Sequence, residues 1–96
     1  MTETKWTPGP WRVGKGGPNL CPTIGTHKGL MLAMVAYGND HPTQANAHLM
    51  AAAPDLYGVL DWAIQSWDEH NKHGFNMQGD WVQDARAALA KARGDV

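Results

Sequence analysis

Two polar side chains, Asn46 and Arg86, stand in alanine-rich stretches of this 96-residue chain. Asparagine is a poor residue for a helix interior, but Asn46 closely follows Thr43, which is a good helix N-cap. The start of a helix is a natural place to hold an anion. Arg86 lies in the run ARAALAKA, and its planar guanidinium suits a phosphate or the edge of a purine. An ion pair with Asp84 or another neighbouring carboxylate explains Arg86 equally well.

The segment GKGGPN, residues 14–19, is glycine-rich and carries Lys15. A Walker-type phosphate loop needs the spacing GxxxxGK[ST] followed by a helix, and this segment has neither. A β-turn is therefore the favoured interpretation. Arg12 and Lys15 would nonetheless place positive charge at one end of the predicted sheet.

The sequence lacks the residue spacings that are typical of metal sites and catalytic sites. His70 and His73 are close together on a predicted helix, but neither HExxH nor paired CxxC spacing occurs. Ser66 falls in the middle of a predicted helix, and nothing around the single cysteine, Cys21, indicates an activated thiolate. We therefore expect no metal, no cofactor and no enzymatic activity.

Length and composition limit the class of protein. The chain suits one domain with a thin core, so we expect a single domain over residues 1–96. Assembly into a homo-oligomer is a common remedy for a thin core. The net charge of −1 argues against a general nucleic-acid binder, and one cysteine excludes an internal disulfide. No apolar run approaches the about 18 residues of a membrane span. The N-terminal MTETKWTPGPW lacks the apolar region of a secretory signal, so a soluble intracellular protein is expected.

The first part of the chain predicts an arm and a small sheet. Residues 1–10 include TPGP, which excludes a helix, and are expected to form an extended arm. A β-meander is predicted over residues 11–38 from the stretches WRVG, CPTIGTH and LMLAMVAYG, with hairpin turns at GKGGPN and HKG. Residues 30–37 lack a polar face and are expected to form the central or most buried strand. Pro22 fits an edge strand or a strand start.

The second part, residues 43–94, predicts helices. The first is expected to run from the N-cap Thr43 to Ala52, with an apolar stripe of Ala45, Leu49, Ala52 and Met50. The second is expected to end at about Lys72 and to bury Leu56, Leu60, Ala63, Ile64 and Trp67. The last is expected to be capped by Asp80 and to bury Trp81, Ala85, Ala88, Leu89 and Ala92. Strands followed by helices indicate an α+β fold: a three- or four-stranded antiparallel sheet with two to three helices packed on one face.

Pro54 stands inside the most helix-like stretch, AHLMAAAPDLYGVL. Within a continuous helix, proline loses a backbone hydrogen bond and costs about 3 kcal/mol. As the first residue of a new helix it costs almost nothing, and Asp55 in the first turn favours the helix dipole. We therefore expect two helices that meet at a corner, with one kinked helix as the alternative.

The segments TPGPW, NAHLMAAAPDLY and ARAALAKA occur in an order that resembles a widespread group of small phage and prophage proteins. The pattern of that group is TPGPW, a few strands, NAxLIAAAPxLL, a variable helix and a last helix like RAAIAKA. The middle motif is specific, and the other two support it. The matching motif positions are Asn46, Leu49, Ala51, Ala52, Ala53, Pro54, Leu56 and Arg86. The sequence departs from the pattern at Tyr57, where the group has leucine, and in the tryptophan-rich residues 61–81.

Some proteins of this group are similar to the Thoeris anti-defence and anti-CBASS sponges. Those sponges sequester cyclic nucleotide or cyclic ADP-ribose signals without cleaving them, and they assemble as oligomers. The resemblance implies a phage-encoded sponge in the cytoplasm of the bacterial host, with a cyclic nucleotide signalling molecule as its partner. Arginine would bind phosphate, and Trp11 or Tyr37 would stack on a base. The candidate ligand-binding residues are Arg86, Asn46, Arg12, Trp11, Tyr37 and His48.

A second function stays open: a small interaction module that acts on a host or phage protein and binds no small molecule. Its motivation is an exposed aromatic face predicted around Trp62, Trp67 and Phe75. Burial of the two tryptophans would remove that motivation. Binding to nucleic acid is disfavoured by the net charge and by only eight lysine and arginine residues.

Overall fold

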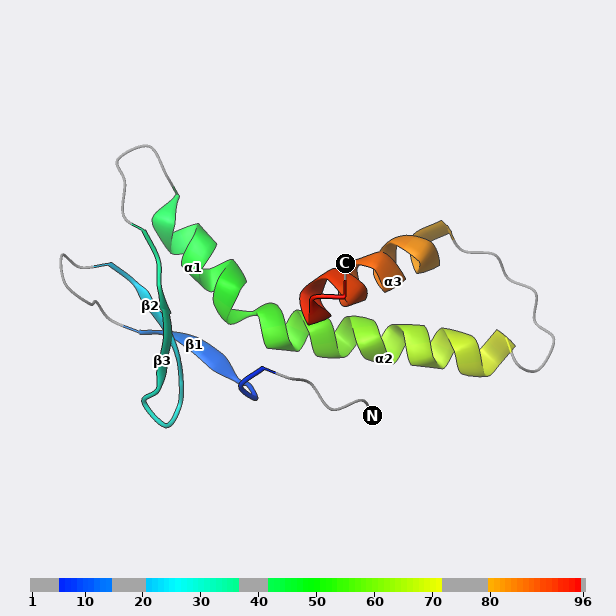
Figure 1. Ribbon diagram of the computed structural model, residues 1–96, viewed down its shortest axis with the longest axis horizontal. Helices are drawn as coiled ribbons and strands as arrows, with labels where there is room; N and C mark the ends of the chain where they lie inside the picture. Colours follow the sequence, from blue (N-terminus) through cyan, green and yellow to red (C-terminus); the bar gives the residue numbers. More distant parts are fainter. Residues whose placement is uncertain (1–5, 15–20, 37–41, 72–79, 96) are drawn as a thin grey trace. The chain divides into compact units, whose positions relative to one another are not determined.

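The computed structural model describes residues 6–14, 21–36, 42–71 and 80–95. Its elements follow the predicted order of strands and then helices (Figure 1). They are β1 (Trp11–Gly14), β2 (Thr23–Thr26), β3 (Met31–Met34), α1 (Thr43–Ala51), α2 (Ala53–Asn71) and α3 (Asp80–Arg93). The three strands form one antiparallel sheet, which confirms the predicted α+β class.

The contacts divide the chain into two compact units. The sheet unit, Thr7–Asp55, contains the three strands, α1 and the start of α2. The helical unit combines Met1–Trp6 with Leu56–Val96 and contains most of α2 and all of α3. The single domain expected over residues 1–96 stays a prediction.

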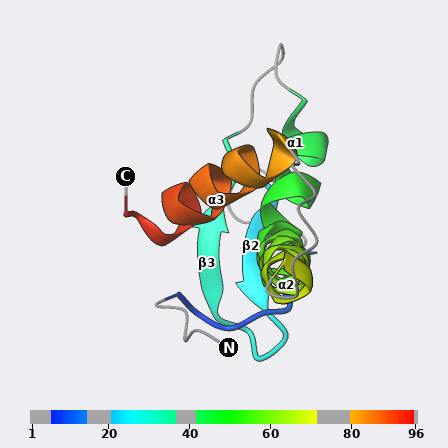
Figure 2. The same ribbon diagram turned by 90° about the vertical axis from the view of Figure 1, so that its right-hand side faces the viewer.

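The strand order is β1-β2-β3, so β2 is the central strand, and Figure 2 shows β2 and β3 side by side. The prediction that residues 30–37 form the central or most buried strand is therefore wrong. Short hairpin connections keep consecutive strands adjacent, which places the middle segment in the middle of the sheet and β3 at an edge. Pro22 directly precedes β2, and its carbonyl accepts a hydrogen bond from Val35 N at 2.8 Å. Pro22 thus marks a strand start, and the edge-strand alternative is wrong.

The turn between β2 and β3 is closed by backbone hydrogen bonds. Thr26 N donates to Leu30 O at 2.9 Å, and Gly29 N donates to Thr26 O at 3.0 Å. Gly29 has a φ of 91°, a left-handed conformation that glycine adopts without steric cost. A glycine in this conformation at the end of a three-residue loop is a common hairpin geometry, and the hairpin turn predicted at HKG is confirmed.

The core of the sheet unit joins the inner face of the sheet to α1. Its buried members are Ile24, Val35, Ala47 and Ala51, with Trp11 and Val13 packed against them. The predicted α1 stripe is wrong, because Ala45, Leu49 and Met50 are exposed and Ala52 is only half-buried. The buried face consists instead of Thr43, Ala47 and Ala51. Small side chains allow the helix to approach the sheet closely, so alanine rather than leucine is buried there.

The start of α1 also differs from the prediction. Pro42 occupies the N-cap position and Thr43 is the first helical residue, so the prediction that Thr43 is the N-cap is wrong. The buried Thr43 hydroxyl donates to the carbonyl of Ala36 at 3.3 Å. It thereby ties the helix to the segment that follows β3.

Two helices, rather than one, occupy the stretch around Pro54. The first ends at Ala51, Ala52 lies in a turn between them, and Pro54 is the second residue of α2. In this first turn the missing N–H of proline has no helical partner to lose. The expectation that Pro54 marks the start of a second helix is confirmed, with the boundary one residue earlier than predicted.

The helical unit packs α2 against α3. Its buried residues are Ile64, Val82, Ala85 and Leu89, with Tyr57, Leu60 and Trp67 packed against them. The predicted faces are thus confirmed at Leu60, Ile64, Trp67, Ala85 and Leu89. They are wrong at Leu56, Trp81, Ala88 and Ala92, which are exposed. Val82 takes the buried position that was assigned to Trp81, whose ring instead meets Trp67 edge to face at 5.4 Å between centroids.

Candidate functional site

A hollow of about 190 Å³ lies on the sheet unit and includes one of the predicted site residues. Residues from all three strands and from the turn before β3 line it, among them Arg12, Gly14, Thr23, Gly25, Leu30 and Met31. Alternation along a strand places residues two apart on one face. In the ladder, Arg12 lies opposite Gly25 and Gly14 lies opposite Thr23. The hollow is therefore on the sheet face opposite to the core.

Gly14 and Gly25 form the floor of this hollow, where neither residue has a side chain to fill it. A Cβ added at Gly14 would lie 2.6 Å from Thr23 Oγ1, and one added at Gly25 would lie 2.6 Å from Leu30 O. Real Cβ atoms do not approach other atoms so closely. Gly25 requires glycine because its neighbour is backbone, whereas at Gly14 the neighbour is a side-chain hydroxyl. At both positions no side chain covers the backbone beside Arg12.

Arg12 supplies positive charge at the edge of the hollow. Its side chain is exposed, and Nη2 donates to the carbonyl of His27 in the turn at 3.3 Å, next to Lys28. Within the described part of the sheet unit, Asp55 is the one carboxylate. Arg12 and Lys28 thus place positive charge at the β2–β3 turn, whereas the predicted pairing of Arg12 with Lys15 stays a prediction, because Lys15 lies outside the described residues.

Trp11 and Tyr37 were predicted to stack on a ligand. Among the described residues, no aromatic side chain lines the hollow with Arg12. Trp11 is adjacent to Arg12 in β1 and so faces the core, where it packs. Its Nε1 donates to the carbonyl of Thr7 at 3.0 Å. Tyr37 lies outside the described residues.

The other predicted site residues lie on helices. Asn46 and His48 are exposed on α1 and belong to the sheet unit. Arg86 belongs to the helical unit, on α3, and its Nη2 donates to Oδ1 of Asp68 on α2 at 2.6 Å. Both side chains are about half exposed. The ion-pair alternative for Arg86 is therefore found in the structure, with a partner on the preceding helix rather than Asp84.

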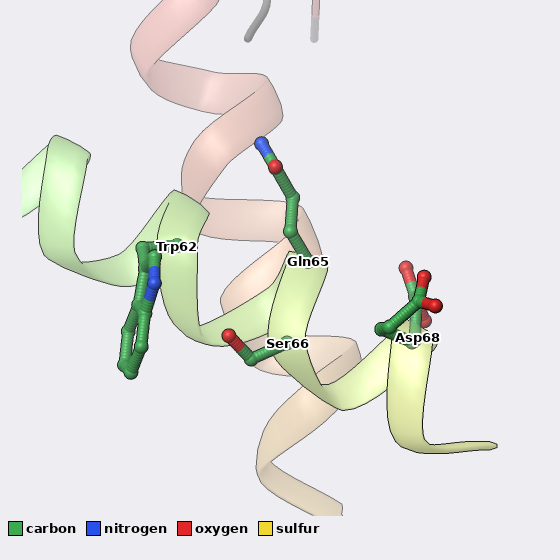
Figure 3. Close-up of a pocket in the computed structure, with 5 residues that line it drawn as sticks. Trp62, Gln65, Ser66 and Asp68 are labelled. Atoms are coloured by element: carbon green, nitrogen blue, oxygen red, sulfur yellow. The ribbon is translucent and has the colours of Figure 1, made fainter.

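An open pocket of about 480 Å³ lies along α2 of the helical unit (Figure 3). It is lined by Trp62, Gln65, Ser66, Asp68 and Glu69. Figure 3 shows Trp62 and Ser66 on the same side of the helix, whereas the side chain of Gln65 extends away from that side. Gln65 Nε2 donates to Asp61 Oδ2 at 3.0 Å. Trp62 and Ser66 are four residues apart, which places them on one side of a helix. This spacing was the signal in the sequence for the pocket.

An apolar stripe adjoins that pocket on α2. Leu56, Val59 and Trp62 are 55%, 67% and 69% exposed and recur every three residues, which places them on one side of the helix. The apolar surface of α2 is thus wider than the part that packs with α3. Of the aromatic face predicted from sequence, Trp62 is exposed, Trp67 packs in the core, and Phe75 lies outside the described residues.

The family of the chain follows from a match over its whole length. The family model described as Salmonella phage P22 protein Y8K6 matches residues 1–96. The chain belongs to this phage protein family. No curated protein and no solved structure matches it.

Two of the motif segments of this P22 Y8K6 family member, TPGPW and NAHLMAAAPDLY, contact each other in the sheet unit. A Cβ added at Gly9 of TPGPW would lie 3.0 Å from Cβ of Pro54 in NAHLMAAAPDLY. From the latter motif, Ala47 and Ala51 are buried. These contacts explain Gly9, Ala47 and Ala51 as packing residues.

Tyr57, where the sequence departs from the resembling group, connects three segments of the helical unit. Its ring meets Trp6 edge to face at 4.7 Å between centroids, and its hydroxyl accepts a hydrogen bond from Arg93 Nη1 at 3.0 Å. The hydrogen bonds to Tyr57 and then to Asp95 raise the pKa of Arg93 above its ordinary value. A leucine could not accept such a bond.

The described residues include no group of three or more histidine, cysteine, aspartate or glutamate side chains that could hold a metal ion. Cys21 is half-buried and free. In the described part of the chain, no helix is both long and apolar enough to cross a membrane.

Proposed function

We propose that this phage protein is a non-enzymatic sponge that captures a cyclic nucleotide or cyclic ADP-ribose signal. The hollow beside Arg12 carries the proposal. A guanidinium with remaining donors suits a phosphate, which accepts charge-assisted hydrogen bonds. The glycine floor suits a flat group, and Leu30 and Met31 offer apolar atoms to a base or sugar. Capture needs these features and no catalytic acid or base.

Thermal unfolding with a panel of cyclic dinucleotides and cyclic ADP-ribose isomers tests the proposal. A ligand at about 100 times its Kd stabilises a protein by about 2.7 kcal/mol, which for a domain of this size is a Tm shift of roughly 10–20 °C. We expect at least one such shift, and recovery of the unmodified ligand after denaturation. The absence of any shift across the panel, or recovery of a cleaved ligand, would contradict a sponge.

A pair of arginine variants locates the ligand. Arg12→Ala should abolish the shift, because the phosphate loses its charged partner in the hollow. Arg86→Ala is the matched control, since Arg86 is already paired with Asp68 in the helical unit, and it should keep the shift. A full shift in Arg12→Ala, or its loss in Arg86→Ala alone, would place the ligand away from the hollow.

The exposed stripe on α2 favours a second candidate, an interaction module for a host or phage protein. An exposed apolar surface of this kind is typical of protein-binding sites. Residues 53–71 carry Asp55, Asp61, Asp68 and Glu69 and no lysine or arginine. The partner surface that fits is therefore apolar with a basic rim.

A pull-down from host lysate, repeated with two variants, tests this candidate. Trp62→Ala should lose the captured protein, whereas Leu49→Ala should retain it, because Leu49 is exposed on α1 and outside the stripe. Equal capture by the Trp62→Ala variant would rule out the stripe as the binding surface.

A further inference from the structure

The β3 edge of the sheet is apolar and lacks the charges and proline that commonly protect an edge strand. Residues 30–36, LMLAMVA, contain no charged residue and no proline. Leu30, Met31 and Met34 are 55%, 57% and 45% exposed. Edge strands of monomeric proteins commonly carry charges or proline, which discourage pairing with another strand. The opposite edge strand, β1, carries the charged Arg12 and directly follows Pro10.

The register places the exposed methionines beside the hollow. Met31 lies opposite Gly25 and Met34 lies opposite Thr23, with a bulge in the ladder between these pairs. Opposite residues share a face of the sheet, so both methionines are on the face that carries Arg12. Any strand added at β3 would therefore border the hollow.

We propose that β3 pairs antiparallel with β3 of a second copy, which joins the two three-stranded sheets into one. Antiparallel pairing of identical strands about a two-fold axis is self-complementary. Because the strand carries no charge, no like charges come to lie opposite each other, and apolar side chains meet apolar side chains. A charged peptide would instead place its charges against methionine and leucine, so a second copy is the occupant that the edge fits.

Pairing in this way also completes the ligand site. The two-fold axis of an antiparallel pair is perpendicular to the sheet. Both hollows therefore open on the same face of the joined sheet. The methionines of the second copy then stand at the rim of the first copy's hollow. One hollow of about 190 Å³ is smaller than the roughly 300–1,000 Å³ of sites that enclose a small molecule. The role in ligand capture rests on the proposed function, whereas the pairing rests on the edge itself.

Native mass spectrometry and sedimentation of the ligand-free protein test the pairing. We expect a dimer for the unchanged chain and a monomer for Met31→Lys and Met34→Lys, because each lysine would bring charge into an apolar joint. Val59→Lys is the matched control, an equally exposed apolar residue of the helical unit, and should stay dimeric. A monomeric unchanged chain, a dimer that survives both β3 variants, or a dimer lost in Val59→Lys would overturn the proposal.

Disulfide trapping keeps the proposal testable even where a lysine variant fails to fold. Single cysteines are placed at Leu32, Ala33 and Met34 in a Cys21→Ser background. In an antiparallel pair, directly opposite residues have Cα atoms about 4.5–5.5 Å apart, within reach of a disulfide. We expect one position to cross-link under mild oxidation and Val59→Cys to form no cross-link. Failure of all three to exceed the control would overturn the pairing.

The two proposals fail separately. Arg12→Ala should still dimerise, because Arg12 lies on the opposite edge strand. A dimer without any nucleotide-induced Tm shift would sustain the pairing and remove the sponge. A monomer whose Tm shift depends on Arg12 would sustain the sponge and remove the pairing.

Discussion

At the residue scale, two arginines that look alike in the sequence have different surroundings. Arg86 has a carboxylate partner 18 positions earlier in the chain, and exposed pairs of this kind contribute about 0–1 kcal/mol to stability. Arg12 donates to a backbone carbonyl beside a glycine-floored hollow. The sequence identified both arginines as candidates but could not separate them, because the partner of Arg86 depends on how α2 meets α3.

The two glycines of the hollow should differ in their tolerance of a side chain. At Gly14 an added Cβ meets the hydroxyl of Thr23, which can rotate away. At Gly25 it meets the carbonyl of Leu30, which accepts the hydrogen bond from Thr26 N. We expect Gly25→Ala to lower the free energy of unfolding by about 1–3 kcal/mol, the usual cost of overpacking, and Gly14→Ala by less. Urea unfolding of the two variants measures the difference.

Gly58 provides the control for these substitutions. It is exposed in α2, and a Cβ added there would have nothing within 4 Å. Gly58→Ala should raise the free energy of unfolding by about 0.5–1 kcal/mol, because alanine loses less backbone entropy in a helix. Equal losses at Gly14 and Gly25, or a loss at Gly58, would contradict this account of the hollow.

At the element scale, the packing of α1 should depend on the small size of its buried residues. Ala47 is 0% exposed and packs with Ile24 and Val35. Ala47→Leu adds volume where none is free, and we expect it to lower the free energy of unfolding by at least about 1–3 kcal/mol. Leu49→Ala, on the exposed side of the same helix, should change it by less than about 0.5 kcal/mol. Chemical denaturation of both variants measures these changes in the free energy of unfolding. A larger change for Leu49→Ala than for Ala47→Leu would indicate that Leu49 is on the packed face, as predicted from the sequence.

Much of the element structure could be predicted from local sequence. Pro54 placed the start of α2 to within one residue, and all three strands fell within the predicted meander. The face of α1 could not be predicted, because hydrophobicity ranks Leu49 above Ala47, whereas the distance between helix and sheet admits only the alanine. The burial of β3 was misjudged for a related reason: its composition suits a central strand, but its place in the chain puts it at an edge.

At the scale of the whole molecule, the candidate site needed information that no local pattern holds. Arg12 was identified from its charge, but the hollow exists because register places Gly25 opposite it and the bulge turns Met31 and Met34 to the same face. Asn46 and Trp11 were also named as candidates, but Trp11 packs against the core and Asn46 is exposed on α1. Charge is also unevenly distributed: residues 53–71 are acidic, and Arg12 and Lys28 lie at one end of the sheet. A net charge near zero hides this asymmetry.

The division of the contacts into two units should be visible in how the molecule unfolds locally. Leu89 is 4% exposed in the core of the helical unit, and Ile24 is 2% exposed in the core of the sheet unit. Truncating such residues to alanine costs about 2–5 kcal/mol. Since contiguous cooperative units open separately in native proteins, Leu89→Ala should reduce amide hydrogen-exchange protection in α2 and α3 and spare the sheet. Ile24→Ala should reduce protection in the strands and α1 and spare α3. Loss of protection throughout the chain in both variants would show one cooperative domain, as the length of the sequence predicts.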